Sequence, residues 1–358
     1  MTKISFKNDG NAFYKTSLIE GISLIVLVIT IIIVIILAGT IILSLSNNNP
    51  ISFATEASFK TDVSNFNSEL QIKLTDEYLN NGNKINARGS NINRYITSLN
   101  LNKYPNKFAI INNVLVYIGN VEREKKYCKD VLNYNEEELY VSEGMILHYD
   151  GKNNTGSGNS INTNIWKDLS GNNNDGKLNQ FDFNNNTSYW KKDGLRFFNS
   201  NVSIKQMNYE YITMEIVAEY ESFKYETTLI ANYEEGGYGI QHRKLDNKQY
   251  FNYCSSNGYI KLQMPDLLVL NKKYSFSGSL SEDYATFSSN GNIVKELVKR
   301  PIKYPLNNTI MALGGNPHQD IVDSEFIGTI YSVRIYNRAL TNEEIQNNYN
   351  IDKMRFDI

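Results

Sequence analysis

The longest apolar run in the chain extends from Ile22 to Leu45 and contains neither a charged residue nor a proline. A helix of this length, rising about 1.5 Å per residue, would be roughly 36 Å long. A bilayer has a hydrocarbon core about 30 Å thick, so such a helix would cross it with some tilt. No other run is comparably long, and we therefore expect a single transmembrane helix over residues 22–45.

The charges beside this run predict its orientation. The head, residues 1–21, contains Lys3, Lys7 and Lys15, whereas residues 46–50 carry no charge. Lys and Arg favour the cytoplasmic side of a membrane span, so we expect a cytoplasmic N-terminus and an extracellular body. A cleaved secretory signal peptide is the alternative, but its apolar core would be only about 7–15 residues long.

The segment between residues 46 and 143 shows first a helical pattern and then a strand pattern. Pro50 is a favourable helix start, and Asn80–Asn83 provide turn residues for its end. Two strand-like runs, 107–111 and 114–119, flank Asn112-Asn113 and predict a hairpin. The apolar residues of the helix recur at spacings of four and three, giving one face that would pack on this small sheet: Phe59, Val63, Phe66, Leu70, Leu74 and Tyr78.

Residues 144–358 have a different pattern, in which short alternating strands are separated by Gly and Asn. The clearest strands are 213–220 and 329–336. So many short strands predict an all-β sandwich or barrel, and the acidic run 135–138 marks the boundary before it. Thr341 and Glu344 form a capping-box pattern that predicts a short terminal helix with Ile345 and Tyr349 as its apolar residues.

The start of the apolar run resembles the cleavage region of type IV prepilins and pseudopilins, on the residues Gly-Ile-Ser-Leu-Ile at 21–25. The resemblance implies cleavage by a prepilin peptidase between Gly21 and Ile22, methylation of Ile22, assembly with other pilins into a surface filament, and a pilin-like α+β module over residues 46–143. Val26 stands where this family usually has a glutamate, and Glu20 where it usually has a basic residue. A tip-like minor pseudopilin would tolerate the loss of the glutamate, and an uncleaved signal anchor is the alternative.

Four motifs stand out in the second half: Leu147–Asp150, Asn154–Gly158, Trp166–Gly176 and Phe326–Thr341. On these motifs, the second half resembles bacterial laminin-G-like domains, which are jelly rolls of the concanavalin A-like lectin and glucanase superfamily. Phe198 and Asn199 depart from the Phe-Asp-Gly that the family often has there. The resemblance implies a jelly roll over residues 144–358 that presents a binding surface to a glycan or a surface protein.

Catalysis is a minority alternative in this sequence. Glu215, Glu219 and Glu221 share one face of a predicted strand, and a glycosidase needs two carboxylates roughly 5–9 Å apart. Val217 interrupts the series, and we interpret the glutamates as the solvated face of an outer strand. The histidines are scattered without metal-ligand spacing: His148, His242 and His318. We therefore expect a non-enzymatic protein, with a surface glycan hydrolase as the low-probability alternative.

Asp150, Asp168 and Asp175 lie in loops rich in Gly and Asn, whose oxygens suit Ca²⁺. Such residues also close turns on their own backbone, so calcium is a possible cofactor and not a required one. Trp166 and Trp190 could stack on a sugar, but each borders an apolar strand, and we expect both in the core.

The net charge of −2 gives no electrostatic reason to expect a nucleic-acid partner. Cys128 and Cys254 fall in different predicted domains, and we expect them to be free and buried. The sequence thus predicts a membrane-anchored surface protein for binding or adhesion. A minor pseudopilin of a type IV pilus or type II secretion-like filament is the alternative.

Overall fold

The computed structural model describes residues 31–33, 50–80, 98–183, 187–232, 236–305, 310–315 and 325–358. The chain divides into two compact units, Met1–Asp62 and Val63–Ile358. The boundary predicted between residues 143 and 144 lies inside the second unit, and it stays a prediction.

The predicted membrane span, 22–45, and the predicted cleavage pair Gly21–Ile22 lie outside the described residues, except that 31–33 are helical. Within the described ranges, no helix is both long enough and apolar enough to cross a membrane.

Helix α2 (Pro50–Asn80) confirms the predicted amphipathic helix and its start at a proline. Its apolar face ends one turn earlier than predicted, because Tyr78 is 42% exposed. The ring of Phe66 meets those of Tyr104 and Phe108 edge-on, each at 6.2 Å between centroids. The buried residues of this face are Phe59, Val63, Phe66, Leu70 and Leu74.

The predicted hairpin is present as strands β1 (Phe108–Ile111) and β2 (Val114–Tyr117). Asn112 and Asn113 have φ of 49° and 65°, the left-handed conformation that a two-residue hairpin turn requires. The helix α4 (Glu122–Leu132) that follows was not predicted. Short 3₁₀ turns are η1 (Leu101–Lys103) and η2 (Glu136–Leu139).

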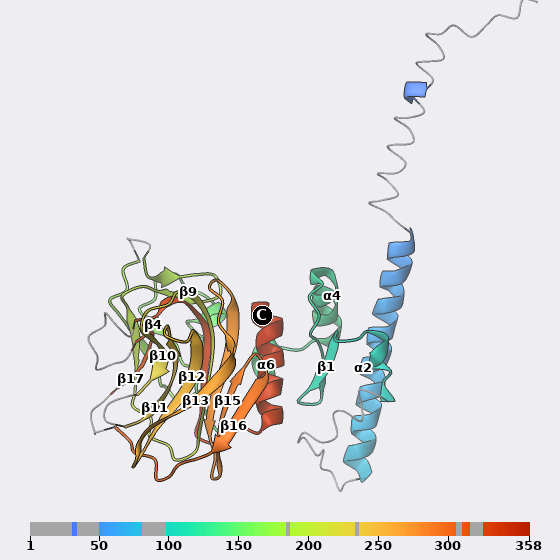
Figure 1. Cartoon of the computed structure of the whole chain (residues 1–358). Helices are drawn as coiled ribbons and strands as arrows, with labels where there is room; N and C mark the ends of the chain where they lie inside the picture. The colour runs from blue at the N-terminus through green and yellow to red at the C-terminus, as the bar shows by residue number, and fades with distance from the viewer. Residues whose placement is uncertain are drawn as a thin grey trace, which may run out of the picture. The chain divides into compact units, whose positions relative to one another are not determined.

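From Met145 onward the chain forms two antiparallel sheets packed face to face, which confirms the predicted sandwich (Figure 1). Sheet 1 has the spatial order β13-β12-β11-β10-β17-β8-β5-β4. Sheet 2 has the order β16-β15-β14-β9-β18-β7-β6, and β3 pairs with the part of β18 that β7 leaves free.

The strands of sheet 1 are β4 (Ile165–Trp166), β5 (Gly176–Asn179), β8 (Asn201–Ile204), β10 (Glu226–Ala231), β11 (Tyr238–Arg243), β12 (Lys248–Ser255), β13 (Gly258–Leu267) and β17 (Met311–Leu313). Those of sheet 2 are β3 (Met145–Asp150), β6 (Tyr189–Trp190), β7 (Leu195–Phe197), β9 (Ile212–Ser222), β14 (Lys273–Leu280), β15 (Tyr284–Ser289), β16 (Asn292–Leu297) and β18 (Ile327–Tyr336). A 3₁₀ turn, η3 (Gly151–Asn153), follows β3.

The core lies between the two sheets, and both tryptophans belong to it as predicted. Trp166 and Trp190 are 0% and 4% exposed, and their rings meet edge-on at 5.1 Å. Their indole N–H groups donate to the backbone carbonyls of Asp150 and Thr163. Because both rings are enclosed and their N–H groups satisfied, neither is a sugar-stacking surface.

The terminal helix α6 (Asn342–Phe356) begins with the predicted capping box, in which Thr341 accepts from the Glu344 N–H and Glu344 accepts from the Thr341 N–H. It runs along the outside of sheet 2 (Figure 1). Ile345 is buried as predicted, but Tyr349 is only half-buried. Much of the buried face is polar, and its residues are Ile345, Asn348, Ile351, Asp352, Met354, Arg355 and Phe356.

Candidate functional site

The three glutamates of β9 share the outer face of sheet 2, as predicted, but this face is not solvated at Glu215. That side chain is 2% exposed because α6 covers this part of the sheet. Glu219 accepts a hydrogen bond from the Tyr331 hydroxyl at 3.0 Å. Glu221 accepts from the Arg196 Nε at 2.9 Å. The interpretation of a solvated strand face was therefore wrong for Glu215, because the sequence did not show which element covers it.

Arg334 on β18 binds Glu215 and α6 together. Its Nε donates to Glu215 Oε2 at 2.8 Å, and its two terminal nitrogens donate to the Asp352 carboxylate at 2.9 and 2.7 Å. Arg334 and Asp352 are both completely buried. Two carboxylates, one from the sheet and one from the helix, thus share one guanidinium.

Neutral donors complete this cluster. Asn348 donates to Glu215 Oε2, and the hydroxyls of Ser275 and Tyr140 donate to Asp352, all at 2.8 Å. The ring of Tyr140 also stacks 4.0 Å from the Arg334 guanidinium. Of the three glutamates of β9, Glu215 thus belongs to a buried ion cluster that joins the sheet to α6.

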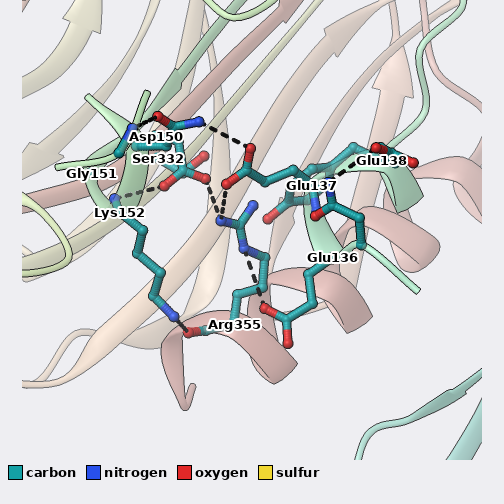
Figure 2. A network of polar contacts seen from close by, with 12 residues as sticks. Glu136, Glu137, Glu138, Asp150, Gly151, Lys152, Ser332 and Arg355 are labelled. Carbon is teal, nitrogen blue, oxygen red and sulfur yellow. Dashed lines mark hydrogen bonds and ion pairs between the residues drawn. The ribbon is translucent and has the colours of Figure 1, made fainter. Parts of the chain in front are cut away.

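Asp150, a predicted calcium ligand, instead binds an arginine of α6. Figure 2 shows Arg355 between Asp150 on one side and Glu136 and Glu137 on the other. Its Nη2 lies 2.6 Å from Asp150 Oδ2 and 3.4 Å from Glu137 Oε1. Lys152 Nζ donates to the Arg355 carbonyl. This network joins α6, β3 and the η2 segment.

Asp168 and Asp175, the other two predicted calcium ligands, close a turn of the backbone. Asp168 accepts from the backbone N–H groups of His148, Ser170 and Asn174, each at 2.9 Å. Asp175 accepts from the Asp168 N–H at 2.9 Å. Their oxygens therefore already have donors, which is the Asx-turn alternative. In the part of the chain that the structure describes, no group of three or more His, Cys, Asp or Glu side chains is placed to hold a metal.

The histidines and cysteines that the structure describes are buried. Burial lowers the pKa of His148 and of His242, so both imidazoles are neutral, and His318 lies outside the described residues. Cys128 and Cys254 are free and buried as predicted. Burial, reinforced by Glu124, raises the pKa of the Cys128 thiol to about 12, so it is unreactive at neutral pH.

The outer face of sheet 1 carries a row of polar side chains that the sequence analysis missed. Thr228, Gln241, Tyr250 and Gln263 are direct cross-strand partners on β10, β11, β12 and β13. Directly paired residues point to the same side of a sheet, so these four side chains lie in one row. The residues that alternate with them, such as Ile240 and Phe251, belong to the core.

The neighbouring row on this face consists mainly of small residues, which are buried. Ala312, Ala231 and Gly239 are successive cross-strand partners with little or no side chain, and Asn252 follows on β12. We call Thr228, Gln241, Tyr250, Asn252 and Gln263 the polar face. A sequence signal for it is the alternation of apolar and polar residues along β13, from Ile260 to Met264, but this pattern does not show what the polar side faces.

Amide hydrogen bonds orient the centre of the polar face. Asn252 Nδ2 donates to Gln241 Oε1 at 2.7 Å, and Gln241 Nε2 donates to Glu226 Oε2 at 3.2 Å. This relay leaves Asn252 Oδ1 without a partner, and Thr228 Oγ1 also has none. The two residues are 3% and 0% exposed. An unpaired buried polar group costs about 1–3 kcal/mol, so each of these two oxygens calls for an explanation.

Neither a family model nor a curated protein matches this chain. Among solved structures, it is similar to a Trypanosoma rangeli sialidase in complex with sialic acid, at 16% identity and a TM-score of 0.44 over 59% of this chain. The chain spans only 33% of that sialidase.

Two further structures are similar at the same level. Domain 4 of AbnA, a GH43 extracellular arabinanase from Geobacillus stearothermophilus, in complex with arabinotriose, has 17% identity and a TM-score of 0.46 over 57% of this chain and 97% of that one. The binding domain of Paraclostridial Mosquitocidal Protein 1 has 15% identity and a TM-score of 0.44 over 58% and 52%. At such identities and TM-scores, the likeness is no evidence of a shared ligand or activity.

We predict that Arg334→Met destabilises the protein by about 3–5 kcal/mol, because it leaves two buried carboxylates without their cation. The matched control is Lys167→Met, which removes a 3.0 Å pair with Asp175 whose side chains are 39% and 34% exposed. We expect the control to cost less than about 1 kcal/mol. Urea unfolding of both variants measures the difference, and equal effects would contradict the structural role of the Arg334 cluster.

We also predict a pH-dependent stability from Glu215. Burial, with the nearby Asp352 charge, raises the pKa of Glu215 from 4.5 to about 7, although Arg334 opposes this rise. Deprotonation is therefore harder in the folded state, and the free energy of unfolding falls as the pH rises from about 4.5 to 7, by up to about 3 kcal/mol. Glu215→Gln keeps an oxygen acceptor for Arg334 and removes this fall. Parallel stability–pH curves for the two proteins would disprove the prediction.

Proposed function

We propose that this chain is a membrane-anchored surface protein whose sandwich, a laminin-G-like jelly roll, binds a glycan through the polar face. The observation that carries the proposal is the pair of buried, unpaired oxygens, Thr228 Oγ1 and Asn252 Oδ1, on one face of sheet 1. Both oxygens accept hydrogen bonds, and sugar hydroxyls donate them.

The arrangement around Asn252 supports recognition of a neutral, hydroxyl-rich ligand. The relay through Gln241 to Glu226 fixes the amide so that its oxygen is the free atom. Tyr250 lies beside it, and its hydroxyl donates to Asp246 and lies 3.2 Å from Gln263 Oε1. A ligand hydroxyl that reached Asn252 would form the hydrogen bond that is missing in the free protein. A ligand without a hydroxyl at that point would leave the Asn252 oxygen unpaired and would bind more weakly.

The prediction that this face is displayed outside the cell rests on the sequence alone. The run 22–45 would anchor the chain, with the N-terminus in the cytoplasm and the sandwich outside. Calcium is not needed for the hydrogen bonds proposed here, and it stays a possible cofactor.

The test is binding of the full chain, purified in detergent, to a glycan array with calcium and with a chelator. For the glycan that binds, we expect Asn252→Ala to weaken binding by roughly tenfold or more, the value of one buried hydrogen bond and its unpaired partner. Asn292→Ala is the matched control, because it removes an exposed amide from β16 of sheet 2 and should bind like the wild type.

Two results would overturn this proposal: no binding to any glycan, or binding that Asn252→Ala leaves unchanged. Loss of binding only with the chelator would instead support the calcium prediction. Release of reducing sugar from the bound glycan would support the hydrolase alternative.

A second candidate function is that of a minor pseudopilin. Helix α2 carries one buried apolar face, and a two-stranded sheet with aromatic contacts to Phe66 follows it. This order of elements is what the prepilin resemblance implies after the leader. The element not predicted is α4, and the cleavage residues are known from the sequence alone.

We expect the N-terminal peptide from native membranes to decide between anchor and pilin. Cleavage after Gly21 would give a peptide starting with methylated Ile22, detected by mass spectrometry. A peptide that starts with Met1 would rule out processing by a prepilin peptidase and leave a signal-anchored binding protein.

A further inference from the structure

Three loops at one end of the sandwich expose large apolar side chains. They connect β9 to β10 (223–225), β11 to β12 (244–247) and β13 to β14 (268–272). Five large side chains in or next to these loops are exposed, and we call them the apolar tips. They are Tyr225, Leu245, Leu267, Val269 and Leu270, which are 64%, 75%, 59%, 59% and 39% exposed.

Backbone hydrogen bonds hold these loops side by side. The Lys244 N–H donates to the Tyr225 carbonyl at 3.0 Å, and the Leu268 N–H donates to the Asn247 carbonyl at 3.4 Å. Leu267 is also the cross-strand partner of Lys248. The apolar tips therefore form one surface and not scattered exposed residues, which would need no explanation.

Basic residues outnumber acidic ones in the same loops. Lys224, Lys244 and Lys272 are their cations, and Asp246 is their single acid, which accepts from the Tyr250 hydroxyl. Lys224 also interacts with Glu325. Lys244 and Lys272 are exposed beside the apolar tips.

The apolar tips lie at the end of the sandwich opposite the point where the chain enters it. Met145, the first residue of β3, pairs with Tyr336, and Tyr336 pairs with Thr213 near the start of β9. The loop with Tyr225 follows Ser222, at the far end of β9. At about 3.3 Å per residue, the two ends of this strand are roughly 30 Å apart.

We infer that the apolar tips insert into the interface of an anionic lipid bilayer, with Lys244 and Lys272 at its headgroups. Transfer of exposed Leu and Tyr side chains from water to the headgroup–acyl boundary lowers the free energy of the system. Each lysine near an anionic surface adds attraction that salt screens.

The test is a capture experiment with two membranes. The full chain is reconstituted in nanodiscs of neutral phosphatidylcholine, so that its apolar run is occupied. Fluorescent vesicles of phosphatidylcholine, with and without phosphatidylglycerol, are then added, and the bound fraction is measured at low and high salt. We expect capture of the anionic vesicles, weakened by salt, and little capture of the neutral ones.

The variant Leu245→Ser/Val269→Ser/Leu270→Ser should lower the partition coefficient for anionic vesicles by at least about tenfold. Because these side chains are exposed, the protein should fold normally. Leu297→Ser is the matched control, since Leu297 is 64% exposed on β16 at the other end of the sandwich, and it should leave capture unchanged.

Equal capture by the triple variant, equal capture of neutral and anionic vesicles, or no capture at all would each overturn the inference. So would a change from oligomer to monomer in the triple variant, because the tips would then bind a second copy. The inference goes beyond glycan binding and does not depend on it. Asn252→Ala, which tests the polar face, should capture vesicles like the wild type, so the two proposals fail separately.

Discussion

The ion cluster around Arg334 holds the outside of the sandwich together. A fully buried guanidinium cannot lose its charge, so it must be surrounded by carboxylates and other acceptors. Glu215 comes from the sheet and Asp352 from α6, and both bind this one cation. The helix is thus fixed at one register on sheet 2, where an apolar interface would tolerate small shifts. Arg355 repeats the arrangement with Asp150, Glu136 and Glu137, and so ties the segment before β3 to the same helix.

The two proposed binding surfaces use different parts of one scaffold. The polar face lies on β10 to β13, the four strands at one edge of sheet 1, where strand pairing holds Gln241 and Asn252 in a hydrogen-bonded geometry. The apolar tips lie on the loops, where side chains such as Leu245 are unconstrained by packing. Directional hydrogen bonding needs the rigid surface, whereas burial of apolar area in lipid has no directional requirement. The two surfaces adjoin, because Tyr250 of the polar face donates a hydrogen bond to Asp246 in the loop that carries Leu245.

Features coded by neighbouring residues were predictable from the sequence. The Asn112-Asn113 turn, the Thr341–Glu344 capping box and the alternating strands each depend on residues a few positions apart, and all were confirmed. The clusters that define the candidate sites depend on distant residues. Arg334 and Glu215 are 119 positions apart, so the residues near each of them in the sequence do not indicate that the two side chains pair. For the same reason, the sequence did not show that Arg355 lies 2.6 Å from Asp150, and the calcium site stays a prediction.

The position of α6 has a consequence for folding during synthesis. A chain that emerges N-terminus first releases β3, β9 and finally β18 before any residue of α6 is available. Until Asp352 and Asn348 arrive, the cluster around Arg334 lacks one of its two carboxylates, and the outer face of sheet 2 remains wet. A chain that stopped before α6 would lack Asn348 and Asp352, and Glu215 and Arg334 would then lie open to solvent on the outer face of sheet 2.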